Sequence, residues 1–192
     1  MRKINFNDKF GLTDAVLNGT KIMTRRVIPQ KVVDECVVSG EAMLHAPFKE
    51  GEIVAIAQSY SDVLEEMVSK KGGFGKEESD FQDEWYGTPG YNNKMFVRAD
   101  LMPHHIRITG IKVERLQDIS EEDCLKEGVY IDESSPSCYQ PFFTFKNSLV
   151  QRTPLGWDNA RDAFAALIDK VGKKDDWNKN PWVYVYEFEL VD

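Results

Sequence analysis

Hydrophobic residues alternate with other residues, or run almost without interruption, in several short stretches, and this pattern predicts a domain rich in short strands. Trp182 to Leu190 alternates valines with aromatic and aliphatic residues, and a period of two is typical of a strand. Glu52 to Tyr60 is nearly continuous in apolar residues and predicts a buried strand. Further extended segments are expected at 21–28, 32–38 and 106–113.

Three helices are predicted between these strands. The first follows Thr13, which can cap it, and ends before Gly19. The second covers 121–127 and begins after Ser120, the first residue of an S-x-x-D capping-box sequence. The third covers 158–171, where apolar residues recur at helical spacing and define one core face.

Many short strands with few helices predict an α+β domain built on a small β-barrel with flanking helices. We expect residues 1–192 to form a single domain with a long insertion at about 61–94. The insertion starts with a charged, helix-like piece around Val63, Leu64 and Met67 and then becomes rich in glycine and acidic residues. It is either a decorated loop or a lid whose Trp85, Tyr86 and Tyr91 can cover a planar ligand. A doubly wound nucleotide fold is not expected, because the sequence has neither G-x-G-x-x-G nor a Walker loop.

The charge balance favours a small ligand over a long nucleic acid. The chain has 192 residues, 42% of them hydrophobic, and a formal net charge of −8. Extensive DNA binding is not expected, since such affinity comes from clustered Lys and Arg that displace counterions. A nucleoside, or a short RNA element held by a local basic spot, fits this composition better.

Cysteine and histidine usage predicts a cytoplasmic protein without a metal or other cofactor. Cys36, Cys124 and Cys138 are odd in number and irregularly spaced, so they indicate neither a disulfide framework nor a zinc site. His104 and His105 lack a third nearby ligand and are expected to be polar residues at a strand entry. A signal peptide and a membrane span are not expected, because no segment approaches the ~20 apolar residues needed to cross a bilayer.

The candidate chemistry lies in the segment Gly19-Thr-Lys-Ile-Met-Thr-Arg-Arg26. It places Lys21, Thr24, Arg25 and Arg26 within one short turn and strand. A lysine, a hydroxyl and fixed cations can act as a base, a nucleophile and an anion clamp. The alternative is a solvated basic strand edge that discourages pairing with other chains.

The order of motifs resembles the ASCH family of PUA-like domains, in the longer form often seen in phage and prophage proteins. The matching segments are G-x-K-x-x-T-x-R at 19–26, R-L-Q-D-I-S-E-E-D through E-G at 115–128, and N-P-W-V through E-F at 180–188. They agree in residue type, spacing and order, and they span nearly the whole chain apart from 61–94 and 130–155.

The resemblance implies a PUA-like β-barrel, a fold that hosts RNA-binding modules and a small bacterial amidohydrolase that deacetylates N4-acetylcytidine. Carried over position by position, the catalytic group of that enzyme falls on Lys21, Thr24 and Glu127. We expect Gly19, Arg25, Arg26 and Tyr60 to contact the ligand, Tyr60 because it ends a buried strand. The present chain is much longer than the compact enzyme, so its insertion can reshape the pocket.

The chemistry sets two conditions. Lys21 must be neutral to act as a base, which requires its pKa to fall by roughly 3 units from about 10.4, at a cost of about 4 kcal/mol. Lys21 and Thr24 would face opposite sides of a straight strand. We therefore expect a bend near Thr20 to Met23, with regular pairing only after it.

Two other functions remain open from the sequence. One is a non-catalytic module that recognises RNA or a modified base, in which the same Lys and Arg grip phosphate and aromatic residues stack on bases. The other is a phage or prophage accessory protein with a vestigial pocket. The sequence does not indicate an oligomeric state.

Overall fold

The computed structural model describes residues 1–37, 40–131, 139–141, 157–172 and 175–191. Cys138, and most of the stretch 130–155 that the family resemblance does not cover, lie outside these residues. Within the described residues, no helix is long and apolar enough to cross a membrane.

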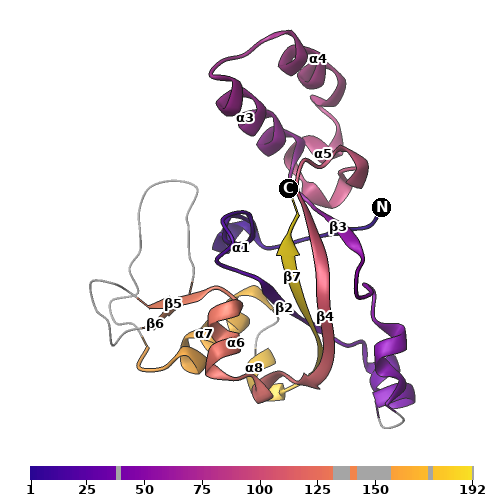
Figure 1. The fold of residues 1–192 in the computed structure, drawn as a ribbon, viewed down its shortest axis with the longest axis vertical. Helices are drawn as coiled ribbons and strands as arrows, with labels where there is room; N and C mark the ends of the chain where they lie inside the picture. The colour runs from indigo at the N-terminus through magenta and orange to yellow at the C-terminus, as the bar shows by residue number, and fades with distance from the viewer. Residues whose placement is uncertain (38–39, 132–138, 142–156, 173–174, 192) are drawn as a thin grey trace. The chain divides into compact units, whose positions relative to one another are not determined.

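The fold is α+β (Figure 1). Seven strands are described: β1 (Lys3–Ile4), β2 (Met23–Val27), β3 (Ile53–Ile56), β4 (His105–Arg115), β5 (Val129–Ile131), β6 (Tyr139–Pro141) and β7 (Trp182–Leu190). The α-helices are α1 (Leu12–Leu17), α2 (Gln30–Val32), α3 (Tyr60–Lys71), α4 (Lys76–Trp85), α5 (Pro89–Asn92), α6 (Glu121–Lys126), α7 (Ala160–Val171) and α8 (Asp176–Lys179). Short 3-10 helices lie at Asp8–Phe10, Glu41–His45, Lys94–Phe96, Ala99–Leu101 and Leu116–Asp118, and a π-helical turn at Val33–Val37.

Five strands form one mixed sheet in the order β1-β3-β4-β7-β2, and β5 pairs with β6 in a separate two-stranded sheet. β1 and β3 are parallel, whereas β2 and β7 are antiparallel, with Met23 opposite Glu187 and Val27 opposite Val183. The pairing order has two ends, at β1 and β2, so the described strands do not form the closed barrel expected from the sequence.

The described residues divide into two compact units. The first contains Met1–Phe6, Ile53–Ile106 and the last residues of the chain, and the second contains Asn7–Glu52 and Arg107–Leu190. The insertion expected at 61–94 belongs to the first unit. The helix-like piece expected at its start is observed as α3, whereas the glycine-rich remainder, expected to be a loop, contains α4 and α5.

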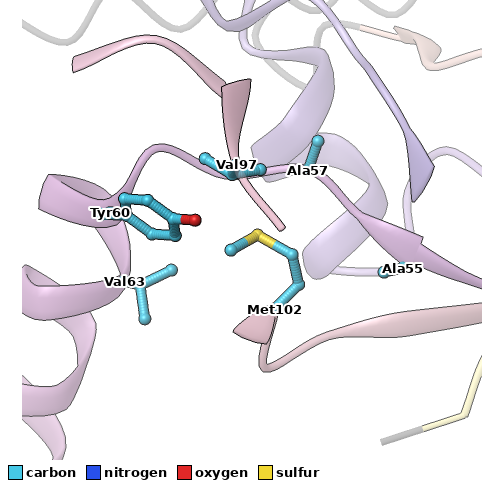
Figure 2. Packing of buried hydrophobic residues seen from close by; sticks show 6 residues of the cluster. All are labelled: Ala55, Ala57, Tyr60, Val63, Val97 and Met102. Atoms are coloured by element: carbon cyan, nitrogen blue, oxygen red, sulfur yellow. The ribbon is translucent and has the colours of Figure 1, made fainter. Parts of the chain in front are cut away.

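The first unit has a core centred on Tyr60, which is 1% exposed. Figure 2 shows the Tyr60 ring above Val63 of the same helix, with the Met102 side chain facing both. The ring of Trp85 lies 4.4 Å from the Tyr60 ring, centroid to centroid. The Tyr60 hydroxyl accepts a hydrogen bond of 2.9 Å from the backbone N–H of Arg98.

In the second unit β7 is the central element. Val183, Tyr184, Val185 and Tyr186 are all buried, so both faces of this strand are covered. α6 packs against α7, and α7 also contacts β5 and β6 (Figure 1). This packing fixes the end of α6 that faces the start of β2.

The segment 32–38, expected to be a strand, is helical in its described part, so that expectation was wrong. Pro29 precedes α2, and the π-helical turn follows without a break. Asp34 and Glu35 are both exposed, which consecutive residues of a strand with one buried face cannot be. The Gln30 side chain donates to Asp34 Oδ1 at 2.7 Å, a contact at helical spacing.

Candidate functional site

Lys21 lies in a non-strand segment between α1 and β2. After α1 ends, Gly19 adopts a left-handed conformation with φ +76°, which glycine tolerates without steric cost. The backbone N–H of Lys21 then donates to Ala15 O at 2.9 Å. Regular pairing of β2 with β7 starts at Met23, so the expected bend before the strand is confirmed.

Glu127 is held at the end of α6. Ser120 caps the start of this helix, its hydroxyl accepting from Asp123 N at 3.1 Å, as the capping-box sequence predicts. Glu127 N donates to Asp123 O at 3.0 Å and so completes the last turn. Gly128 follows with φ +98° and turns the chain away.

The carbonyl groups at the end of α6 are satisfied by the segment that carries Lys21. Ile22 N donates to Lys126 O at 2.9 Å, and Lys21 Nζ donates to Glu127 O at 2.8 Å. The last carbonyls of a helix have no partner inside it. The last carbonyls of α6 therefore accept hydrogen bonds from a backbone N–H, that of Ile22, and from a cation, Lys21, both in the segment before β2.

Lys21 and Glu127 form a buried ion pair. Lys21 Nζ lies 2.5 Å from Glu127 Oε2, and the two side chains are 3% and 4% exposed. These residues are 106 positions apart in the sequence. Removing two charges from water costs several kcal/mol per ion, so such a pair is retained only with good geometry and further hydrogen bonds.

Arg25 supplies part of that support, from the first half of β2. Its Nη1 lies 3.1 Å from Glu127 Oε1, and its Nη2 lies 2.7 Å from Glu114 Oε1 and 3.0 Å from Asp123 Oδ2. Its Nε also donates to Glu114 Oε1 at 3.1 Å. All three guanidinium nitrogens therefore contact a carboxylate, and the side chain is 1% exposed.

Lys112 extends this arrangement of paired opposite charges toward solvent. Its Nζ lies 3.0 Å from Glu114 Oε2 and 3.0 Å from Asp123 Oδ2, and its side chain is 47% exposed. Opposite charges thus alternate from the surface to the buried Lys21. We refer to Lys21, Arg25, Lys112, Glu114, Asp123 and Glu127 as the charge network.

The electrostatics of the site favour loss of the proton from Lys21. Burial lowers the pKa of Lys21 and is the largest influence. Glu127 opposes this effect, whereas the positive charges of Arg26 and Arg25 add to it. The pKa of Arg25 is raised, because Glu127 and Glu114 together outweigh its own desolvation. Arg25 therefore stays charged while Lys21 is poised nearer to its neutral form.

Thr24 is buried but lies on a different face of β2 from Arg25. Arg25 Nη1 contacts the sulfur of Met23 at 3.2 Å, so these two side chains share one face. Side chains alternate along a strand, which places Thr24 and Arg26 on the other face. Burial lowers the pKa of Arg26 and Glu127 opposes this, so Arg26 also interacts with that carboxylate.

The remaining expected ligand residues are placed differently. Gly19 is exposed in the turn after α1. Tyr60 is the first residue of α3, not the end of a strand, and its ring and hydroxyl are engaged in the core of the first unit. Its role as a ligand contact stays a prediction.

The sequence did not point to Glu114, Lys112 or a charge role for Asp123. One signal was present: Asp123 and Glu127 are four residues apart on one helix, which places both carboxylates on one face. Lys112 and Glu114 are likewise two apart in β4, on one face of that strand. Glu114 and Asp123 contact both Arg25 and Lys112, and these contacts depend on packing between distant segments.

The Cys124 thiol lacks the low pKa of a reactive cysteine. Cys124 is fully buried, and burial raises the pKa of its thiol to about 12. Among the described residues, no group of three or more His, Cys, Asp and Glu side chains is arranged to hold a metal ion.

No family model, no curated protein and no solved structure matches this chain. The similarity to ASCH domains therefore rests on the sequence motifs alone.

Proposed function

We propose that this chain is an ASCH-type, PUA-like domain that hydrolyses the amide of an acylated nucleobase, with N4-acetylcytidine as the candidate substrate. The observation that carries the proposal is the contact between Lys21 and Glu127. The family motifs assign these two positions to one catalytic group, and in the second unit their side chains lie 2.5 Å apart. The α+β architecture, with its mixed five-stranded sheet, is the coarser feature of the fold that supports the proposal.

In this proposal Lys21 is the general base. A lysine can accept a proton only when it is neutral, and burial together with two neighbouring arginines lowers its pKa. Glu127 receives hydrogen bonds from Lys21 and Arg25 on separate oxygens. It orients the amine and can pass a proton toward the leaving nitrogen.

The reaction proceeds by acyl transfer. The Thr24 hydroxyl attacks the acyl carbon as its proton passes to neutral Lys21, and the bond between that carbon and N4 breaks as N4 takes up a proton. Water then hydrolyses the ester on Thr24 and releases acetate. Arg26, on the same face of β2 as Thr24, is the cation suited to the tetrahedral oxyanion.

The burial of the cations favours an enzyme over an RNA-binding module. Phosphate recognition requires Lys and Arg heads that reach the backbone of the nucleic acid. Lys21 and Arg25 instead point at carboxylates and are almost completely buried. Binding to a small neutral base fits this arrangement better.

The test is hydrolysis of N4-acetylcytidine, followed by its ultraviolet absorbance, with wild-type protein, Lys21→Met and Lys31→Met. Lys31 is an exposed lysine of the same unit and serves as the matched control. We expect turnover by wild type and Lys31→Met, and loss of about 100-fold or more with Lys21→Met. No turnover by wild type at high protein concentration would contradict the proposal. Binding of short RNA that weakens steeply with salt would then favour the non-catalytic module.

Thr24→Val separates two forms of the mechanism. If Thr24 is the nucleophile, Thr24→Val abolishes turnover and Thr24→Ser retains part of it. Turnover retained in Thr24→Val would mean that Lys21 and Glu127 activate water directly. An acetylated Thr24 peptide, trapped by rapid acid quench and found by mass spectrometry, supports the first form.

A further inference from the structure

Arg25 has the contacts of a residue that supports Glu127. Its guanidinium touches Glu127, Glu114 and Asp123 at distances from 2.7 to 3.1 Å. Its side chain is 1% exposed. A guanidinium with all three nitrogens on carboxylates, and almost no exposed surface, has little left with which to bind a ligand.

The two carboxylate oxygens of Glu127 are divided between two cations. Oε2 accepts from Lys21 Nζ at 2.5 Å, and Oε1 accepts from Arg25 Nη1 at 3.1 Å. The backbone carbonyl of Glu127 accepts a further bond from Lys21. Arg25 therefore fixes the orientation of the carboxylate from the side opposite Lys21.

We propose that Arg25 is a positioning residue that acts through Glu127, holding this carboxylate against Lys21 and limiting how strongly it retains the proton of Lys21. Its relevance to catalysis rests on the proposed function, but its effect on Lys21 does not. The charged groups that face Lys21 are Glu127 from α6 and Arg25 and Arg26 from β2. Glu114 from β4 and Asp123 from α6 act on Arg25.

Two substitutions are expected to shift the pKa of Lys21 in opposite directions. Arg25→Gln removes a positive charge near Lys21 and leaves Glu127 with less compensation, so the pKa of Lys21 rises by about one unit or more. Glu114→Gln removes a carboxylate that shares Arg25, so the guanidinium acts more fully on Glu127 and the pKa of Lys21 falls. A purely structural contribution of Arg25 predicts no such pair of opposite shifts.

The experiment is a pH titration of Lys21 by NMR, in protein labelled with ¹³C at lysine Cε, with the Lys21 signal assigned through Lys21→Met. Wild type, Arg25→Gln, Arg25→Lys and Glu114→Gln are compared, and Arg107→Gln is the matched control. Arg107 is half exposed and pairs with Glu189 at 2.8 Å, outside the charge network. We expect the pKa of Lys21 to rise with Arg25→Gln, to rise less with Arg25→Lys, to fall with Glu114→Gln and to stay unchanged with Arg107→Gln.

Shifts of Arg25→Gln and Glu114→Gln in the same direction, or no shift in either, overturn the proposal. If Arg25→Gln does not fold, by far-ultraviolet circular dichroism, Glu114→Gln decides alone, and an unchanged or raised pKa of Lys21 overturns it. The titration needs no substrate, so failure to hydrolyse N4-acetylcytidine does not affect it. If turnover is found, each rise of one unit in the pKa of Lys21 lowers the fraction of neutral Lys21 about tenfold at pH values below that pKa. We expect kcat/KM to fall by the same factor.

Discussion

Replacing Glu127 with Gln isolates the charge that stabilises protonated Lys21. The substitution keeps the shape of the side chain and leaves an oxygen to accept from Lys21 Nζ, but removes the negative charge. Arg25 retains Glu114 and Asp123 as partners, so the cation left without its main carboxylate is Lys21. Its side chain is 3% exposed, and solvent therefore does little to replace Glu127.

The protonation equilibrium of Lys21 limits the resulting loss of stability. Breaking a buried pair by removing one partner costs about 3–5 kcal/mol. A stranded lysine can always escape this cost by releasing its proton. Even from the ordinary lysine pKa of 10.5 that release costs at most about 5 kcal/mol at pH 7, and it costs less here because burial lowers the pKa of Lys21 in the folded protein. At pH 9 the upper limit on the loss of stability is only about 2 kcal/mol.

The sign of the pH dependence follows from the direction of the shift. Burial lowers the pKa of Lys21 in the folded state, so the folded protein binds fewer protons than the unfolded chain, and stability rises with pH between the two pKa values. Without Glu127 the pKa of Lys21 falls further. The destabilisation by Glu127→Gln is therefore largest at low pH and fades as the pH rises through the pKa of Lys21 in the folded wild type.

Urea unfolding, monitored by tryptophan fluorescence, measures this directly. The wild type, Glu127→Gln and the double variant Lys21→Met/Glu127→Gln are compared at pH 7 and pH 9. We expect a larger loss at pH 7, at most about 5 kcal/mol, than at pH 9, where it is at most about 2 kcal/mol, with part of the loss at pH 7 restored in the double variant. A loss that is the same at both pH values, or a double variant no more stable than Glu127→Gln, would refute the reasoning.

Three further predictions concern the elements that hold the site. Gly128→Ala is expected to lower stability by about 1–2 kcal/mol, because φ is +98°, whereas the new Cβ would make only an ordinary contact with Lys21 Cβ at 3.6 Å; thermal unfolding measures it. Ser120→Ala removes the acceptor for Asp123 N and is expected to cost about 1 kcal/mol in urea unfolding, with Ser120→Asp restoring most of it. The Cys124 thiol, buried and with its pKa raised to about 12, is expected to react with iodoacetamide at pH 8 about tenfold or more slowly than in the urea-unfolded chain, as followed by peptide mass spectrometry.

Elements whose signals are local could be predicted from the sequence. β7 spans the expected Trp182–Leu190, because alternation over nine residues leaves little choice of register. α6 begins after Ser120 as expected, because its cap is formed by residues three apart. The helix expected at 158–171 is observed as α7, with Asn159 as its cap.

Elements that depend on competing local signals were mispredicted. The strand expected at 52–60 ends at Ile56, because Ser59 and Asp62 form a reciprocal capping box that starts α3. The apolar run before Tyr60 favoured a strand, so the capping box was not recognised in the sequence. In the insertion, Phe81 and Trp85 are four residues apart and both pack on Tyr60, a helical spacing that the surrounding glycines and acidic residues obscured.

The residues of the candidate site likewise fall into those with a local sequence signal and those without one. Lys21 and Glu127 were found because motifs name them, and Arg25 because it lies in the same basic segment. Glu114 and Lys112 lie in a strand that carries no motif of its own. The contact of Glu114 with Arg25 joins β4 to β2 across 89 positions of the sequence. Such a juxtaposition depends on the folded arrangement of strands and leaves no periodic trace in the sequence.

The charge network also explains why the basic segment at 19–26 need not act as a surface patch. Lys21, Arg25 and Arg26 all interact electrostatically with one carboxylate, Glu127. Guanidinium groups do not lose their protons at accessible pH, and Arg25 is further held by Glu114 and Asp123. Competition among three cations for one carboxylate is therefore relieved most easily by deprotonation of Lys21. The same residues that look like a phosphate clamp in the sequence thus lower, once folded, the pKa of a buried lysine, which is the direction that a general base requires.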